Sequence, residues 1–128
     1  MQNITATIGK DHYQTVLTNS RHQIIADEPK DYEGTDLGPN PHELLMMSLA
    51  SCTAITLRMY ADRKKWEIEQ IIVEVNYLKE QGKNTFNRQI SVVGSISEDE
   101  KTRLLHIANA CPVHKTLTHP IEINTTLL

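Results

Sequence analysis

The sequence predicts a mixed fold in which short antiparallel strands accompany one unusually long helix. Three observations lead to this prediction: weakly alternating segments within residues 4–26, a long apolar segment after Pro41, and two alternating segments on either side of Gly82. A chain of 128 residues has the size of one domain and can bury about two-thirds of its unfolded surface. We therefore expect a single domain over residues 1–128.

The N-terminal region predicts three short strands, at residues 4–8, 13–17 and 22–26. A turn at residues 9–12 separates the first two. Residues 27–40 follow, with glycines, prolines and acidic residues but no apolar period, which is typical of a surface loop. Loops of this length are often functional or contact a partner.

A long helix is predicted to begin at Pro41 and to end near Lys64. Asn40 is the expected N-cap, and Glu43 stands three residues later, as in a capping box. Residues 44–57 are apolar nearly all round, so most sides of the helix must be buried. A second copy of this small chain would solve that problem. The same stretch contains Ser and Thr residues and is expected to be too short and too polar to span a bilayer.

A hairpin is predicted after this helix. Residues 71–78 alternate between apolar and polar side chains, a turn is expected around Gly82, and residues 86–94 alternate again. Four side chains of the second segment share one face of the predicted strand: Phe86, Arg88, Ile90 and Val92.

The C-terminal part predicts two further helical segments and a strand. Ser97 and Glu100 form a capping-box pattern that begins a helix through Ala108. A short helix is expected at residues 112–118. Residues 121–127 alternate cleanly and predict a final strand.

Composition excludes several classes of function. The net charge is only -3, without basic blocks or interleaved aromatic and basic residues, which argues against nucleic acid as a partner. No signal-peptide pattern follows Met1, so we expect a cytoplasmic protein that acts away from membranes. In that reducing compartment the two cysteines indicate transient redox chemistry, metal binding or no special role.

Cys111 lies between a helix and Pro112, which cannot continue that helix but suits the first position of the next one. Free backbone N–H groups would then face the sulfur, and His114 and Lys115 could add positive charge. Such surroundings lower the pKa of a thiol. The alternative is that Cys111 is only a small apolar residue at a helix end.

Cys52 lies in the middle of the long apolar helix, where an isolated cysteine is usually inert core. Its neighbours Ser48, Leu49 and Thr56 suggest another interpretation, a pocket with small polar side chains beside an apolar wall. A metal site is the rival hypothesis, with Cys52, Cys111, His42 and His114 as ligands. No pair among them has the short spacing of structural zinc sites, so we expect neither a metal nor a cofactor.

Three segments of the chain carry a family resemblance: DLGPNPHELLMMSLASCTAITLRMYADRKKW, VVGSISEDEKTRLLHIANACPVHKTL and IEINTTL. They resemble the OsmC/Ohr family of thiol-dependent hydroperoxide reductases. IIADEP and CPVH resemble the family's OsmC-like branch. The resemblance implies an α+β fold and an intertwined homodimer with two long central helices packed against antiparallel sheets.

The resemblance also implies a mechanism and a role in the oxidative stress response. Cys52 would be the peroxidatic cysteine, whose thiolate attacks an organic hydroperoxide, or hydrogen peroxide, and becomes a sulfenic acid. Cys111 would resolve it as a disulfide, which a small dithiol or a lipoylated protein would reduce.

The sequence departs from the family pattern at the residues that support the thiolate. His42 occupies the position of the family's glutamate, and Glu43 is rotated by about 100° around the helix. His42 is ~15 Å from Cys52 along a straight helix, so it could serve only the Cys52 of a partner copy. Arg21 is a candidate for the family's arginine, with Lys10 as another. These departures leave a second hypothesis, a non-enzymatic ligand-binding or redox-sensing dimer with weak or no peroxidase activity.

Overall fold

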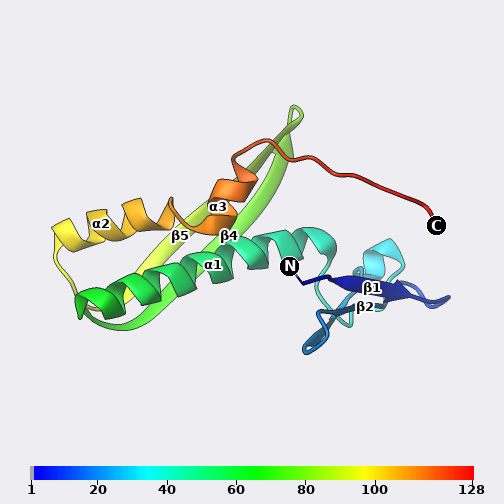
Figure 1. The fold of residues 1–128 in the computed structure, drawn as a ribbon, viewed down its shortest axis with the longest axis horizontal. Helices are drawn as coiled ribbons and strands as arrows, with labels where there is room; N and C mark the ends of the chain where they lie inside the picture. The colour runs from blue at the N-terminus through cyan, green and yellow to red at the C-terminus, as the bar shows by residue number, and fades with distance from the viewer. Residues whose placement is uncertain (1) are drawn as a thin grey trace. The chain divides into compact units, whose positions relative to one another are not determined.

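The computed structural model describes residues 2–128, which form two compact units (Figure 1). The first unit ends at Leu45 and the second covers residues 46–128. The fold combines helices with antiparallel sheets, which confirms the predicted α+β class.

The first unit contains a three-stranded antiparallel sheet in the order β1-β2-β3. Its strands are β1 (Thr5–Ile8), β2 (Thr15–Thr18) and β3 (Gln23–Ala26). β1 and β3 lie within the segments predicted from alternation, and β2 overlaps its predicted segment and extends one residue beyond it, to Thr18. The loop after β3 includes one turn of 3-10 helix, η1 (Lys30–Tyr32).

A buried carboxylate organises this loop. Asp27 is only 2% exposed and accepts five hydrogen bonds. Four come from the backbone N–H groups of Tyr13, Glu28, Thr35 and Leu37, and one from the Thr35 hydroxyl. Burial alone would raise the pKa of Asp27, but these donors lower it well below its ordinary range. The predicted surface loop is therefore folded around an anion.

Helix α1 (Pro41–Lys64) has the predicted bounds. The capping box is present, because the Asn40 Oδ1 accepts from the Glu43 N–H at 2.8 Å and the Glu43 Oε1 accepts from the Asn40 N–H at 2.9 Å. Pro41 begins the helix without the loss of a helical hydrogen bond.

The second unit contains the predicted hairpin, formed by β4 (Glu67–Glu80) and β5 (Lys83–Ser95). Gln81 and Gly82 both have positive φ, 52° and 75°, as a two-residue turn of type I′ requires. At the other end of the hairpin, Gly94 has a φ of 148°, and a Cβ there would lie 2.3 Å from the Glu67 carbonyl oxygen. Only glycine fits this close approach.

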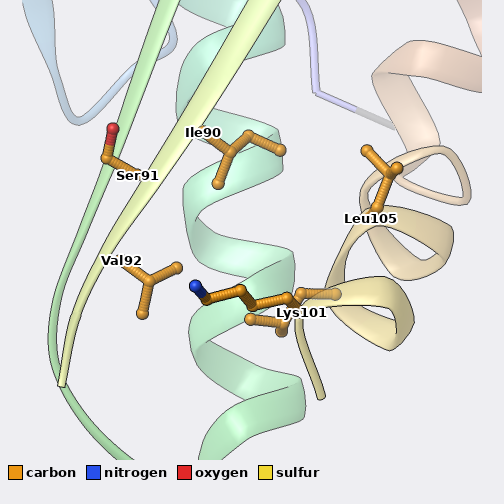
Figure 2. A pocket seen from close by; sticks show the side chains of 6 residues that line it. Ile90, Ser91, Val92, Lys101 and Leu105 are labelled. Atoms are coloured by element: carbon orange, nitrogen blue, oxygen red, sulfur yellow. The ribbon is translucent and has the colours of Figure 1, made fainter. Parts of the chain in front are cut away.

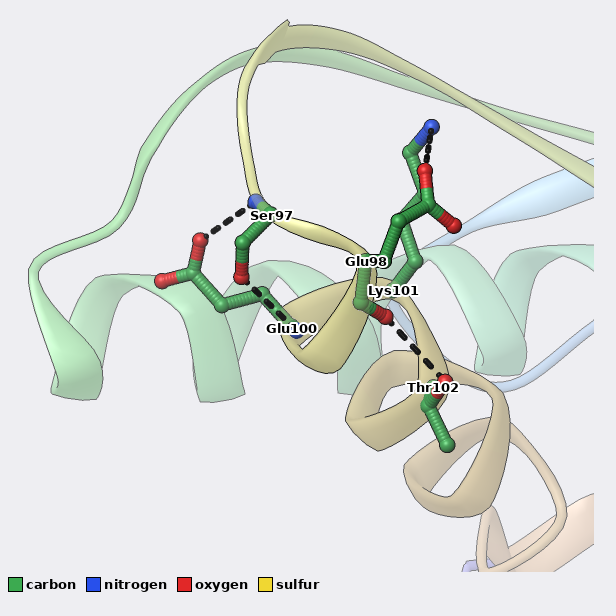
Figure 3. A network of polar contacts seen from close by, with 5 residues as sticks. All are labelled: Ser97, Glu98, Glu100, Lys101 and Thr102. Atoms are coloured by element: carbon green, nitrogen blue, oxygen red, sulfur yellow. Dashed lines mark hydrogen bonds and ion pairs between the residues drawn. The ribbon is translucent and has the colours of Figure 1, made fainter.

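Helices α2 (Glu98–Ala108) and α3 (Pro112–Leu117) follow the hairpin. Figure 3 shows the predicted capping box at the start of α2, in which the Ser97 Oγ accepts from the Glu100 N–H and the Glu100 Oε1 accepts from the Ser97 N–H. The core of this unit joins α1, β4 and α2, and its buried members are Leu57, Ala61, Ile68, Leu104 and Ala108.

The predicted strand at residues 121–127 is absent from this chain, because the described residues after α3 form no regular secondary structure. The segment pairs with neither sheet, and a strand without a neighbour has no partner for its backbone groups. The side chains of its apolar positions are exposed, Ile123 by 84% and Leu127 by 97%.

Helix α1 buries one stripe of side chains and exposes the rest of its apolar surface. The buried stripe is Leu49, Thr53, Leu57 and Ala61, at intervals of four residues. An 18-residue window of the helix has a mean hydropathy of 1.4, and 22% of it is buried. By length and composition α1 could thus cross a membrane, contrary to the sequence-based expectation, although core helices of soluble proteins also meet this criterion. The exposed apolar residues of α1 within the second unit include Met47, Ile55 and Met59.

Candidate active site

The two cysteines lie together in the second unit. Cys52 comes from the middle of α1, and Cys111 is the N-cap of α3. The Cys52 side chain lowers the pKa of the Cys111 thiol, so the two sulfurs belong to one cluster, and both thiols are free. Cys111 is completely buried, whereas Cys52 remains partly exposed. Cys52 is therefore the sulfur that a small molecule can reach.

The Cys111 sulfur is surrounded by hydrogen-bond donors. As the sequence predicted, Cys111 caps α3, and its Sγ accepts from the His114 N–H at 3.3 Å. Pro112 begins the helix. The Thr53 Oγ1, which is also completely buried, lies 3.8 Å from the Cys111 Sγ.

Arg88 connects three elements around this sulfur. From β5, its Nη1 donates to the Thr53 Oγ1 at 3.0 Å. Its Nη2 donates to the Asn109 Oδ1 at 2.9 Å and lies 3.1 Å from the His114 Nδ1. The guanidinium therefore bridges α1, the end of α2 and α3.

The contact between Arg88 and His114 fixes the protonation of the imidazole. A guanidinium can only donate, so the His114 Nδ1 must accept and the ring proton resides on Nε2. Burial and the Arg88 charge both lower the pKa of His114 below its ordinary value. His114 is therefore a neutral residue of this cluster near pH 7.

The pKa of the Cys111 thiol lies below its ordinary value. Burial opposes this shift, since it raises the pKa of a thiol. The His114 backbone N–H, the Thr53 hydroxyl, the Cys52 side chain and the Arg88 charge outweigh burial and favour the thiolate. The cluster can thus hold one negative charge on a buried sulfur.

Arg88, Thr53 and Asn109 were not predicted as site residues from the sequence. A signal existed for Arg88, because this charged residue shares a strand face with Phe86, Ile90 and Val92, all of which are half-buried. An arginine on an apolar face needs a polar partner. Thr53 follows Cys52 directly, and only the position of β5 distinguishes it from the other hydroxyl residues of α1.

Three further predicted site residues belong to the first unit. Arg21 is exposed between β2 and β3, and the Glu43 carboxylate caps α1. His42 is exposed in the first turn of α1. These three residues belong to the first unit, whereas both cysteines belong to the second.

The predicted pocket residues differ from one another in burial. Leu49 is part of the buried stripe of α1, Thr56 is half-buried and Ser48 is exposed. Within residues 2–128, no group of three or more His, Cys, Asp or Glu side chains is arranged to hold a metal ion.

A separate cavity of about 360 Å³ lies between β5 and α2 (Figure 2). Neither cysteine lines it. Its wall is mostly apolar, with the Lys101 ammonium as a charged group, and the lining residues are Ile90, Ser91, Val92, Lys101, Leu104 and Leu105.

Comparisons with known proteins agree with this fold. The family model described as OsmC-like protein matches residues 34–126. No curated protein sequence matches the chain.

Several solved structures are similar. The OsmC-like protein of Mycoplasma pneumoniae is 25% identical over 91% of this chain and 86% of that one, with a TM-score of 0.78. The organic hydroperoxide resistance protein OhrB of Bacillus subtilis is 19% identical over 92% of this chain and 90% of that one, with a TM-score of 0.62. An organic hydroperoxide resistance protein of Legionella pneumophila is 18% identical over 92% and 89% of the two chains, with a TM-score of 0.63. With its family model matched over most of its length, the chain belongs to the OsmC-like family.

Proposed function

We propose that this protein is a thiol-dependent peroxidase that reduces organic hydroperoxides through Cys52 and Cys111. The observation that carries the proposal is the contact between an accessible thiol and a buried one that favours its thiolate form. Solved structures of similar fold include proteins named for organic hydroperoxide resistance, which supports the choice of substrate class.

In the first step, Cys52 attacks the peroxide, because it is the more exposed sulfur. The Cys111 thiolate takes the proton of the Cys52 thiol, whose side chain acts on the Cys111 sulfur. The Cys52 sulfur then bonds to the terminal peroxide oxygen as the O–O bond breaks. The leaving alkoxide takes the proton from the Cys111 thiol and departs as the alcohol, so Cys111 is a thiolate again and Cys52 has become a sulfenic acid.

In the second step, the Cys111 thiolate attacks the Cys52 sulfenic sulfur. The S–S bond forms while the S–O bond breaks, and the hydroxide leaves as water after it gains a proton. The disulfide is returned to two thiols by an external dithiol, either a small molecule or the lipoyl group of a protein.

We also propose that the active form is a cytoplasmic homodimer. The exposed apolar side of α1 and the unpaired, alternating segment at residues 121–127 support this assembly. Large exposed apolar surfaces on a chain of this size mark interaction sites. A second copy can cover α1 and offer a sheet edge to the terminal segment.

Consumption of tert-butyl hydroperoxide with dihydrolipoamide as reductant tests the function. Cys52→Ser should lower the rate roughly 100-fold or more, since no nucleophile remains. Cys111→Ser should accumulate a trappable sulfenic acid on Cys52. Ser51→Ala, which changes an exposed hydroxyl beside Cys52 on the same helix, is the matched control and should retain wild-type activity. Equal rates for wild type and Cys52→Ser would refute the proposal.

The cavity between β5 and α2 favours a second candidate, a small-ligand-binding or redox-sensing protein. Its mostly apolar lining suits a small apolar ligand. In that case, stoichiometric peroxide would form one disulfide per chain, but no turnover would follow with dihydrolipoamide. The assay above separates the two candidates.

A further inference from the structure

Among residues 2–128, no carboxylate forms an ion pair with Arg88, which is a half-buried cation. Its three acceptors, Thr53, Asn109 and His114, are all neutral groups. The ion pairs among residues 2–128 join Arg58 to Asp62 and Lys101 to Glu98, and neither involves Arg88. A charge taken partly out of water without a counter-ion is unfavourable.

In this cluster, the Cys111 sulfur is the group that can carry a negative charge and so balance the charge of Arg88. Arg88 contacts the Thr53 hydroxyl, which in turn contacts the Cys111 Sγ, and the Arg88 charge acts on Cys111. The titratable groups around this sulfur come from three elements: Cys52 on α1, Arg88 on β5 and His114 on α3. Because His114 is neutral, Arg88 is the cation of this set.

We propose that Arg88 is a positioning residue that keeps Cys111 as a thiolate, directly by its charge and through Thr53. The inference rests on the proposed function for its role in catalysis. Arg88 prepares the sulfur that removes the Cys52 proton and later attacks the Cys52 sulfenic acid. It does not touch the peroxide.

The geometry explains why Thr53 transmits the effect. The Thr53 Oγ1 accepts the Arg88 Nη1–H at 3.0 Å, so its own hydrogen must point elsewhere. Two acceptors are in reach, the Leu49 carbonyl oxygen at 2.7 Å and the Cys111 Sγ at 3.8 Å. A nearby cation makes the hydroxyl a stronger donor, and a thiolate is the better acceptor of the two forms of the sulfur.

The second amino group of the guanidinium, Nη2, fixes the position of the Arg88 side chain. The Nη2 group is shared between Asn109 and His114, at the end of α2 and in α3. A lysine would carry the same charge, but its single ammonium could not make the contacts of both Nη1 and Nη2. The arrangement therefore requires both the charge and the fork of an arginine.

The test measures the ultraviolet absorbance of the thiolate against pH in the full chain, without peroxide. A Cys52→Ser background leaves Cys111 as the one thiol, so the titration belongs to it. Arg88→Met in that background should move the midpoint to higher pH, and Arg88→Lys should move it by less. Arg58→Met is the matched control, since Arg58 also joins a helix to the hairpin, through the Ile68 carbonyl oxygen at 2.9 Å, and it should leave the midpoint in place.

In the protein with both cysteines, Arg88→Met should slow disulfide formation from the sulfenic acid by about tenfold, in line with the loss of one opposite charge near a thiolate. Circular dichroism verifies that each variant is folded. If Arg88→Met is unfolded, Arg88→Lys is used as the test variant in its place. An unchanged midpoint in both Arg88 variants overturns the inference. A shifted midpoint in a wild-type protein that does not turn over peroxide would refute the proposed function and leave the role of Arg88 intact.

Discussion

Each unit of this protein surrounds one buried acidic group with partners that lower its pKa, but the two units do so in different ways. Asp27 accepts five hydrogen bonds, and all of its donors lie within fourteen residues along the chain. The Cys111 sulfur depends on groups of α1 and α3 and on the Arg88 charge of β5, which lie far apart in sequence. The first charge organises a loop, whereas the second depends on the assembled unit.

The difference shows what a reactive anion requires. The donors to Asp27 are backbone N–H groups and one hydroxyl, from the loop itself and from Tyr13 before β2, and none of them is a group that readily reacts. Cys111 has among its partners a second thiol, which can lose its proton and form a bond. A stabilised anion becomes chemically useful when one of its partners can react.

The largest effect is expected when Asp27 loses its charge. Asp27→Asn places an amide N–H₂ group where the loop directs several N–H donors, so at least one buried donor loses its acceptor. We expect the midpoint of thermal unfolding to fall by several degrees. Differential scanning calorimetry measures this, and an unchanged midpoint would show that the loop does not need the anion.

A moderate effect is expected at Thr53, which is completely buried. Thr53→Val preserves the shape but removes the hydroxyl between Arg88 and Cys111. We expect the unfolding free energy to fall by ~1–2 kcal/mol and disulfide formation to slow. Urea unfolding and stopped-flow fluorescence measure the two changes. If only stability fell, Thr53 would have a structural role alone.

The two units should also differ in how their stability depends on pH, through His114 in one and Asp27 in the other. His114, next to Cys111, has a pKa below its ordinary value of 6.5, so the folded state binds fewer protons than the unfolded state. Its contribution is complete above pH 6.5 and is lost as the pH falls through the folded pKa. Asp27 contributes in the same direction, but its loss begins only below its ordinary value of 3.8.

His114→Gln should therefore remove a modest decline in unfolding free energy that begins below pH 6.5, while the acid transition due to Asp27 remains. Urea unfolding at a series of pH values gives the difference between variant and wild type. If the curves of unfolding free energy against pH ran parallel for variant and wild type, the pKa of His114 would be the same in the folded and unfolded states.

The smallest effect is expected at Thr35. Thr35→Val removes one hydroxyl donor from Asp27 and leaves its four backbone donors in place. Since the hydroxyl lowers the pKa of Asp27, acid unfolding should begin at a slightly higher pH. A loss as large as that of Thr53→Val would contradict the view that local backbone donors are sufficient here.

Features fixed by local chemistry could be predicted from the sequence. The capping boxes at Asn40 and Ser97, the turn at Gly82 and the N-cap position of Cys111 are all present. Each depends on residues within one or two turns, where side-chain type decides which backbone groups are satisfied.

Features that depend on contacts between distant elements were harder to predict. Arg88 reaches Cys111 only because β5 packs beside α1 and α3, and no local pattern gives that register. At the C-terminus, in contrast, the sequence predicted an element that the structure does not contain. Its alternation at residues 121–127 is real, but a strand also needs a neighbour, and this chain alone does not provide one.

The single hydrogen of the Thr53 hydroxyl has a consequence for spectroscopy. Within α1 it can reach the Leu49 carbonyl oxygen at 2.7 Å or turn toward the Cys111 sulfur. When the sulfur is ionised and takes this hydrogen, the Leu49 carbonyl retains only its helical hydrogen bond and its stretching vibration moves to higher frequency. A ¹³C label at the Leu49 carbonyl would thus let infrared light report the charge of a sulfur that no reagent can reach directly.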